Sequence, residues 1–172
     1  MIFHLSGPLN IAIDFIAWLL IHVSVSVCLS RINPAHFNPY SWLFKERKWE
    51  TNGTIYRSVL AIKKWKNFLP DGAAVSKSGF RKKHLNNSEP SYLQRFLLET
   101  CRAELTHWII FLFSLLFFLW NEWWIGLIMI AYGLITNMPC IIAQRYNRIR
   151  LVRVIVSPEL PCNNENTAAS DV

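Results

Sequence analysis

The apolar residues of this chain are gathered into three long runs instead of being spread along its 172 residues. The runs lie at 9–29, 108–120 and 123–135, while the segment 31–102 is polar and basic. An α-helix rises about 1.5 Å per residue and the hydrocarbon layer of a bilayer is about 30 Å thick, so crossing it takes about 20 apolar residues. The pattern therefore predicts an all-α integral membrane protein with about three transmembrane helices.

The second and third runs reach spanning length when neighbouring residues are included, over 103–120 and 123–142. Only Asn121 and Glu122 separate them, so we expect a tight helical hairpin. Three tryptophans flank this turn, as is typical of a membrane–water interface.

The first run contains two polar exceptions, Asp14 and His22. A charged group inside a bilayer is costly, so we expect a partner or a water-filled cavity beside them. The alternative to a span is a cleaved signal peptide. Against cleavage, no basic residue precedes the run, its apolar stretch is longer than that of a usual signal peptide, and Ser30-Arg31 is a poor cleavage site. We predict a retained span; cleavage would invert the topology of the rest.

Charge predicts the orientation of the spans. All 18 lysines and arginines lie in two segments, 14 of them within 31–102 and four within 145–153. The positive-inside rule therefore predicts an external N-terminus, a cytoplasmic central segment, an external hairpin turn and a cytoplasmic C-terminal segment. Three spans satisfy every basic residue at once.

The chain divides into four predicted regions. They are a first transmembrane helix at 1–30, a basic cytoplasmic or interfacial region at 31–91, a helical hairpin of two spans with a basic flank at 92–153, and a disordered polar tail at 154–172.

The basic region has its own local patterns. The segment 40–49 mixes aromatic and basic residues, which predicts an interfacial helix or a re-entrant piece. Asn52-Gly53 predicts a turn, and 55–69 has the periodicity of a basic amphipathic helix on a membrane surface. Ser91 is the predicted N-cap of a helix that runs directly into the second span. The expected partner of these basic surfaces is the lipid bilayer, not nucleic acid.

Familiar catalytic and metal-binding signatures are absent from the sequence. The four cysteines have no Cys-x-x-Cys spacing, which indicates neither a disulfide framework nor a structural zinc site. There is no Gly-x-Ser-x-Gly elbow and no Gly-rich phosphate loop. We predict no metal and no resident cofactor.

The first candidate group for chemistry lies where the second span begins. Helical spacing puts Glu104 and His107 on neighbouring surface, and pairs Glu99 with Arg102 in the same way. A histidine beside a carboxylate at the water–lipid boundary can act as a general base, with its tautomer fixed by that carboxylate. The alternative is that the group only satisfies charges where the helix enters lipid. A Glu-x-x-His metal half-site is disfavoured, because nothing supplies a second half.

A second candidate group lies in and after the third span. Asn137 lies within the span, and Gln144, Arg145, Asn147 and Arg148 follow it. Planar donors and acceptors of this kind can hold phosphate, hydroxyl or carbonyl groups. The alternative is structural: arginines here satisfy the positive-inside rule with no further role, and an asparagine within a span commonly bonds another helix.

A third candidate group combines the lysines around Trp65 with Asp71, which lies in a Pro-Asp-Gly turn. Lysines in this position suit lipid headgroups, and an aspartate in a turn often bonds its own backbone. On physical grounds alone the structural interpretation is favoured.

Taken in order, the three groups resemble those of the glycosyl-4,4'-diaponeurosporenoate acyltransferases, small bacterial membrane proteins that finish staphyloxanthin-type carotenoid synthesis. The resemblance runs from about Arg31 to Leu151. The matched stretches are Lys64-Trp65-Lys66 with Asp71-Gly72, Glu99-Thr100 with Arg102-Ala103-Glu104-Leu105 and His107-Trp108, and Asn137, Pro139, Gln144-Arg145-Tyr146-Asn147-Arg148 and Arg150-Leu151. The chain departs from the family pattern in its longer polar tail and in Cys101, neither of which touches the motifs.

The resemblance implies a multi-pass enzyme of the bacterial cell membrane. It would transfer a fatty acyl group from a thioester, acyl-CoA or acyl carrier protein, to the primary hydroxyl of a glucose on a C30 carotenoid acid. The expected partners are therefore the bilayer, the carotenoid glycoside and the acyl thioester. The sequence predicts no oligomeric state.

For this reaction we expect His107, oriented by Glu104, to take the proton from the sugar hydroxyl. Arg102 or Arg145 would stabilise the oxyanion. The expected substrate-binding residues are Asp71, Asn137, Gln144, Arg145, Asn147, Arg148 and Trp65. Two alternatives stay open, namely an acyltransferase for another lipid or glycolipid, and a non-enzymatic membrane scaffold. Convergence of the polar side chains of the two spans at one membrane depth would favour an enzyme.

Overall fold

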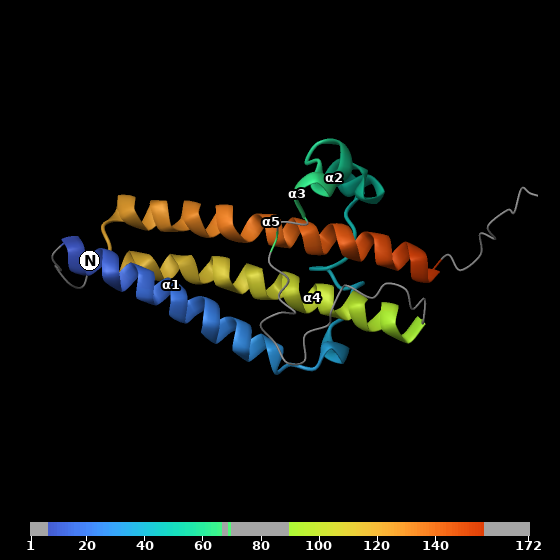
Figure 1. Cartoon of the computed structure of the whole chain (residues 1–172), viewed down its shortest axis with the longest axis horizontal. Coiled ribbons are helices and arrows are strands. Elements are labelled where there is room, and N and C mark those ends of the chain that lie inside the picture. Colours follow the sequence, from blue (N-terminus) through green and yellow to red (C-terminus); the bar gives the residue numbers. More distant parts are fainter. Residues whose placement is uncertain (1–6, 67–68, 70–89, 157–172) are drawn as a thin grey trace, which may run out of the picture.

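Three long helices run side by side along the molecule (Figure 1). The computed structural model describes residues 7–66, 69 and 90–156. Its long helices are α1 (Gly7–Ser30), α4 (Pro90–Phe113) and α5 (Trp123–Val156). All three are long and apolar enough to cross a membrane, α4 together with the 3-10 turns that follow it. The predicted all-α class and the three spans are thus confirmed.

Helices α4 and α5 form the predicted hairpin. The 3-10 helix η5 (Ser114–Leu119) extends α4, and a short turn then leads into α5. Within the turn, Asn121 is buried at 2% exposure, and its backbone N–H donates to the carbonyl of Phe117. Helix α4 begins at Pro90, one residue before the predicted N-cap, so Ser91 lies inside the helix instead of capping it. The helix runs on directly into the second span, as predicted.

Helix α1 is joined to the hairpin turn through Asp14, for which the sequence predicted a partner. The Asp14 Oδ1 atom accepts hydrogen bonds of 2.8 Å from Trp120 Nε1 and of 2.8 Å from Asn121 Nδ2. Asn10 donates to the side-chain oxygen of Asn121 at 2.7 Å. The start of α1 and the hairpin turn therefore lie at the same end of the bundle, as Figure 1 shows. These hydrogen bonds stabilise the buried carboxylate.

Replacing Asp14 with alanine is expected to loosen α1 from the hairpin. The change leaves the buried donors of Trp120 and Asn121 without an acceptor, which costs about 1–3 kcal/mol. The midpoint of thermal unfolding in detergent should fall, and α1 should become easier to cleave with protease. Asp14→Asn is the control because it keeps an acceptor oxygen. Equal midpoints for wild type and Asp14→Ala would show that this contact does not hold α1.

The segment between α1 and α4 is less helical than its sequence predicts. Residues 40–47 form turns instead of an interfacial helix, and they lead into the 3-10 helix η2 (Lys48–Gly53). The predicted helix 55–69 is broken into α2 (Thr54–Ser58) and α3 (Ile62–Trp65). The break lies at Ala61, whose φ of 44° is left-handed and cannot continue a helix. A further 3-10 helix, η1 (Pro34–His36), follows α1.

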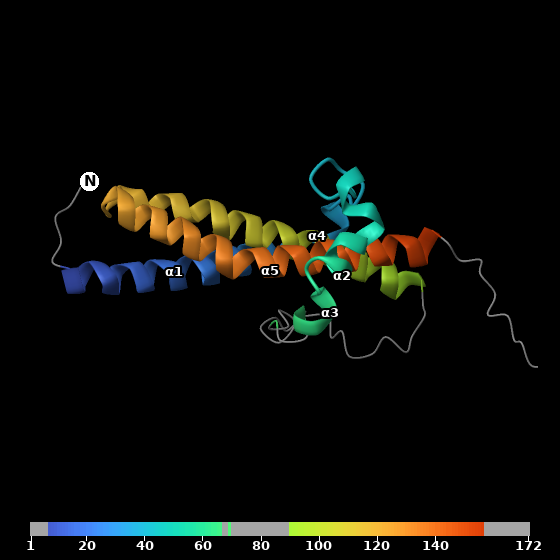
Figure 2. The same cartoon turned by 90° about the horizontal axis from the view of Figure 1, so that it is seen from above.

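The predicted Asn52-Gly53 turn is present and has a packing role. Both residues are left-handed, with φ of 61° and 78°. At Gly53 a β-carbon would come to 3.6 Å from the Tyr146 ring, so the turn lies against α5. Helices α2 and α3 pack on the same face of α5 and form an apolar cluster there (Figure 2). The members of this cluster are Tyr56, Ile62, Ala143, Tyr146 and Ile149.

Candidate functional site

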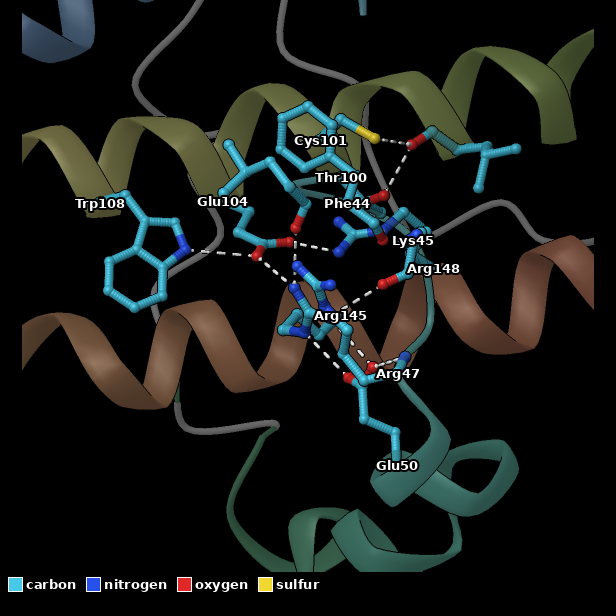
Figure 3. Close-up of polar contacts among 12 residues, drawn as sticks. Phe44, Lys45, Arg47, Glu50, Thr100, Cys101, Glu104, Trp108, Arg145 and Arg148 are labelled. Atoms are coloured by element: carbon cyan, nitrogen blue, oxygen red, sulfur yellow. Dashed lines mark hydrogen bonds and ion pairs between the residues drawn. The ribbon is translucent and has the colours of Figure 1, made fainter. Parts of the chain in front are cut away.

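Four charged side chains from three parts of the chain meet between α4 and α5 (Figure 3). Glu104 lies on α4, Arg145 and Arg148 on α5, and Glu50 on η2. Both carboxylates have no exposed side-chain surface. Arg145 is 2.9 Å from each carboxylate, and Arg148 forms an ion pair with Glu104. We call these four residues the ionic cluster. Its two acids balance its two bases, so no net charge is buried.

Arg145 uses all five of its N–H donors within the protein. Its Nε and Nη2 atoms donate to Glu50 at 2.9 and 3.0 Å, and its Nη1 atom donates to Glu104 at 2.9 Å. The carbonyls of Leu43 and Lys45 accept the other two bonds, at 3.1 and 3.2 Å. An arginine has five N–H groups. The predicted oxyanion role of Arg145 would therefore require one of these bonds to break, and it stays a prediction.

The turns at 40–47, whose sequence has no helical periodicity, supply backbone carbonyls that accept hydrogen bonds from both arginines of the ionic cluster. Besides Leu43 and Lys45, the carbonyl of Phe44 accepts a 2.9 Å bond from Arg148 Nε. Glu50 also accepts bonds from the Tyr56 hydroxyl and from the backbone N–H of Arg47. Sequence reasoning missed Glu50, which lies 95 positions from its arginine. The one feature of the sequence that could have drawn attention to Glu50 is that it is an acidic residue within a basic segment.

The environment of Glu50 alters two pKa values. Burial alone would raise the pKa of the Glu50 carboxyl, but hydrogen bonds from Arg145, from Tyr56 and from the Arg47 backbone outweigh burial and lower the pKa. Burial, followed by the bond to the Glu50 carboxylate, raises the pKa of Tyr56. Glu50 is therefore held ionised and Tyr56 protonated at neutral pH.

The lowered pKa of Glu50 predicts a pH-dependent stability. A carboxyl with a folded pKa below its unfolded value of about 4.3 stabilises fully above that value, and the effect is lost as pH falls through the folded pKa. In detergent unfolding, the difference in midpoint between wild type and Glu50→Gln should be large at pH 7 and shrink below about pH 4. Glu46→Gln, at a more exposed acid, is the control. A difference that stays constant with pH would contradict this assignment.

His107 has a different partner from the one predicted. Its Nδ1 atom lies 2.9 Å from Oδ1 of Asn137 on α5. Glu104, the predicted orienting carboxylate, is occupied by Arg145, by Arg148 and by Trp108 Nε1 at 3.3 Å. A carboxylate pairs more strongly with a guanidinium than with a neutral imidazole, so the tertiary contacts prevail over the helical neighbour. The prediction that Glu104 orients His107 is therefore wrong.

Arg102 lies on another face of α4 and connects it to α1. It forms the predicted ion pair with Glu99, at 2.6 Å. Its Nη1 atom also lies 3.3 Å from the carbonyl of Ser30 and 3.4 Å from that of Ile32. These contacts satisfy carbonyls at the end of α1. Arg102 thus has a structural role in linking the two helices, and its predicted oxyanion role stays a prediction.

The remaining predicted residues are distributed around the ionic cluster. Gln144 and Asn147 are half-buried on α5 beside the two arginines. Trp65 donates to the carbonyl of Leu60 at 2.7 Å, and it lines an apolar groove of about 380 Å³ beside α5. The groove is otherwise lined by Leu134, Ile135, Met138, Pro139 and Ile142. Asp71 lies outside the described residues, as does the predicted Pro-Asp-Gly turn.

Polar side chains of the two spans converge as expected of an enzyme. Glu104, His107, Asn137 and Arg145 all face the contact between α4 and α5 and form two adjoining groups. Arg145 and Glu104 belong to the closed ionic cluster, whereas His107 and Asn137 form an uncharged pair. Among the described residues no three His, Cys, Asp or Glu side chains gather as a metal site would require.

Comparison with known proteins gives a consistent match. A family model described as glycosyl-4,4'-diaponeurosporenoate acyltransferase matches residues 40–157. Relatives with that name from Staphylococcus aureus strains bovine RF122 / ET3-1 and N315 are each 30% identical over 138 residues, or 80% of this chain and 83% of the relative. No solved structure matches the chain. The matched region contains both the ionic cluster and the pair of His107 with Asn137.

Proposed function

This chain belongs to the glycosyl-4,4'-diaponeurosporenoate acyltransferase family, and we propose that it esterifies the glucose primary hydroxyl of a glycosylated C30 carotenoid acid with a fatty acyl group. The resemblance noted in the sequence is therefore confirmed at the level of the family. An acyltransferase replaces the scaffold alternative. The acceptor, the acyl group and the residue roles that follow belong to the proposal.

The reaction needs a base and no redox partner. His107 removes the proton from the sugar hydroxyl while the hydroxyl oxygen attacks the thioester carbonyl carbon. The tetrahedral intermediate then collapses, the carbon–sulfur bond breaks, and the thiolate takes the proton from the imidazolium. The products are the sugar ester and a free thiol. The donor is acyl-CoA or acyl carrier protein, which acts as a co-substrate, and no resident cofactor is required.

The observation that carries this proposal is the depth of His107. It lies three residues beyond Glu104 on α4, or about 4.5 Å further along the helix axis, on the side of the apolar span. Arginines and glutamates mark the polar boundary, and His107 lies just inside it. A glycoside whose tail is dissolved in the bilayer would hold its sugar at this boundary. The base is then placed where hydroxyl and lipid meet.

The charge distribution supports entry of the donor from the basic end of the bundle. Lys63 and Lys64 are exposed on α3, and Arg57 is exposed on α2. Fixed positive charge raises the local concentration of an anionic ligand, such as the phosphates of acyl-CoA or the acidic surface of a carrier protein. With this end cytoplasmic, the protein would be a multi-pass enzyme of the bacterial cell membrane, with α1 retained.

The test is the conversion of a defined acceptor. Membranes containing the protein would be mixed with the carotenoid glycoside and with acyl-CoA or acylated carrier protein, and the extracted lipids would be analysed by mass spectrometry. We expect the glycoside to gain the mass of one acyl group, with fragmentation placing it on the primary hydroxyl. Acylation of another lipid from the same membranes, with the glycoside unchanged, would overturn the proposed acceptor.

A further inference from the structure

We propose that Asn137 is a positioning residue that holds His107 in the tautomer protonated at Nδ1, so that Nε2 is the basic nitrogen. The proposal rests on the function proposed above only for its consequence in catalysis. The tautomer itself is a property of the folded protein.

The imidazole ring of His107 faces an acceptor oxygen. Oδ1 of Asn137 lies 2.9 Å from Nδ1 of His107. An amide oxygen accepts hydrogen bonds and cannot donate one, so the proton between these atoms belongs to the ring. A neutral imidazole carries one proton, which leaves Nε2 with its lone pair. The same bond would persist if His107 became protonated during turnover.

The orientation of the amide is fixed by its other end. Nδ2 of Asn137 donates to the carbonyl of Gly133 at 2.9 Å, and it lies 3.3 Å from Oγ1 of Thr136. Turning the amide over would bring its oxygen against the carbonyl oxygen of Gly133, where neither atom can donate. The amide group is itself deeply buried, since Asn137 is 1% exposed. Water therefore offers little competition for its hydrogen bonds.

Tight packing keeps the Gly133 carbonyl in place. A β-carbon at Gly133 would come to 3.1 Å from the Trp18 ring of α1 and to 3.3 Å from Ser114. The backbone of α5 therefore approaches α1 and the start of η5 closely at this point, where a larger residue would force Trp18 or Ser114 to shift by a few tenths of an ångström. Three helices thus combine to fix one side-chain amide.

In the part of the chain that the structure describes, no carboxylate contacts the imidazole to compete for this role. Among the described residues, the hydrogen bond that the His107 side chain makes is the one to Asn137. Glu104 on the same helix is paired with Arg145 and Arg148. On α1, His22 is a titratable group close enough to be influenced by the charge of His107. A neutral acceptor is sufficient, because it selects the tautomer without adding a charge to the span.

The first arm of the test observes the tautomer without any substrate. The full-length protein would be labelled with ¹⁵N-histidine and placed in lipid nanodiscs, with the His107 signals assigned by their loss in His107→Gln. We expect Nδ1 to be protonated and Nε2 unprotonated in wild type, and both tautomers to appear in Asn137→Leu. Asn137→Asp, whose buried carboxyl in its neutral form can accept from His107 and donate to Gly133, should restore the single tautomer. Protonation at Nε2 in wild type, or an unchanged tautomer in Asn137→Leu, would overturn the inference.

The second arm measures acyl transfer with the same proteins. Asn137→Leu should lower kcat by about 10²-fold or more, with the roughly 10⁴-fold contribution of a general base as the upper limit. KM should change little. Asn137→Asp should recover much of kcat. A large rise in KM with kcat unchanged would instead make Asn137 a substrate-binding residue and overturn a positioning role in catalysis. If wild type shows the expected tautomer but acylates nothing, the proposed function fails and the tautomer assignment stands.

Discussion

Replacing Arg145 with methionine is expected to lower the free energy of unfolding by about 3–5 kcal/mol, the typical cost of removing one partner from a buried ion pair. The change leaves Glu50 without its guanidinium and deprives Glu104 of one of two, while neither carboxylate has exposed surface. It also leaves the carbonyls of Leu43 and Lys45 without their donor. The turns 40–47 should then separate from α5.

Unfolding in detergent, followed by circular dichroism against temperature, measures this loss. The matched control is Arg153→Met on the same helix, because Arg153 is 46% exposed and lies 4.0 Å from Glu46, a pair worth at most about 1 kcal/mol. Adding Glu50→Gln to the Arg145 variant should recover part of the lost stability by removing the charge left unpaired. An Arg145→Met midpoint equal to that of Arg153→Met would contradict a central role for the cluster.

Replacing His107 with glutamine is expected to lower the rate of acyl transfer by about 10²–10⁴-fold, the contribution of a general base. Glutamine keeps a polar side chain that can still bond Asn137, so the α4–α5 contact should persist and the folded amount should not change. The quantity to measure is kcat with the carotenoid glycoside as acceptor. His36→Gln is the control, since His36 is exposed on η1 and lies 3.1 Å from the carbonyl of Asn33. Equal rates for the two variants would remove His107 from the reaction.

The architecture of the bundle was predictable because lipid imposes it. Apolar runs of spanning length predict the three helices, and the two-residue break at Asn121 and Glu122 predicts an antiparallel hairpin. In an antiparallel hairpin with a short turn, residues at equal distances from the turn lie at the same depth. The sequence therefore predicts that His107 and Glu104 lie near Asn137 and Arg145, but not which atoms make contact. The buried Asp14 also required a partner, and Trp120 and Asn121 supply it.

The detailed partners were not predictable, for identifiable physical reasons. Helical spacing shows that Glu104 and His107 can be neighbours, but it carries no information on stronger partners from other segments. Glu50 reaches Arg145 across 95 positions, on turns without periodicity. The break at Ala61 was equally hidden, because alanine is a good helix former and its residue type gives no sign of the left-handed backbone that it adopts.

The division of labour between the two groups is the central claim. The ionic cluster holds the irregular turns on α5, and we propose that the pair of His107 with Asn137 performs the chemistry. One experiment tests both halves, namely the amount of folded protein in the membrane and the acyl transfer per folded molecule, measured together for His107→Gln and Arg145→Met. We predict that His107→Gln is present in normal amount with almost no turnover. Arg145→Met should be scarce, yet the molecules that fold should transfer acyl groups. Near-normal turnover per folded molecule in His107→Gln would contradict the account.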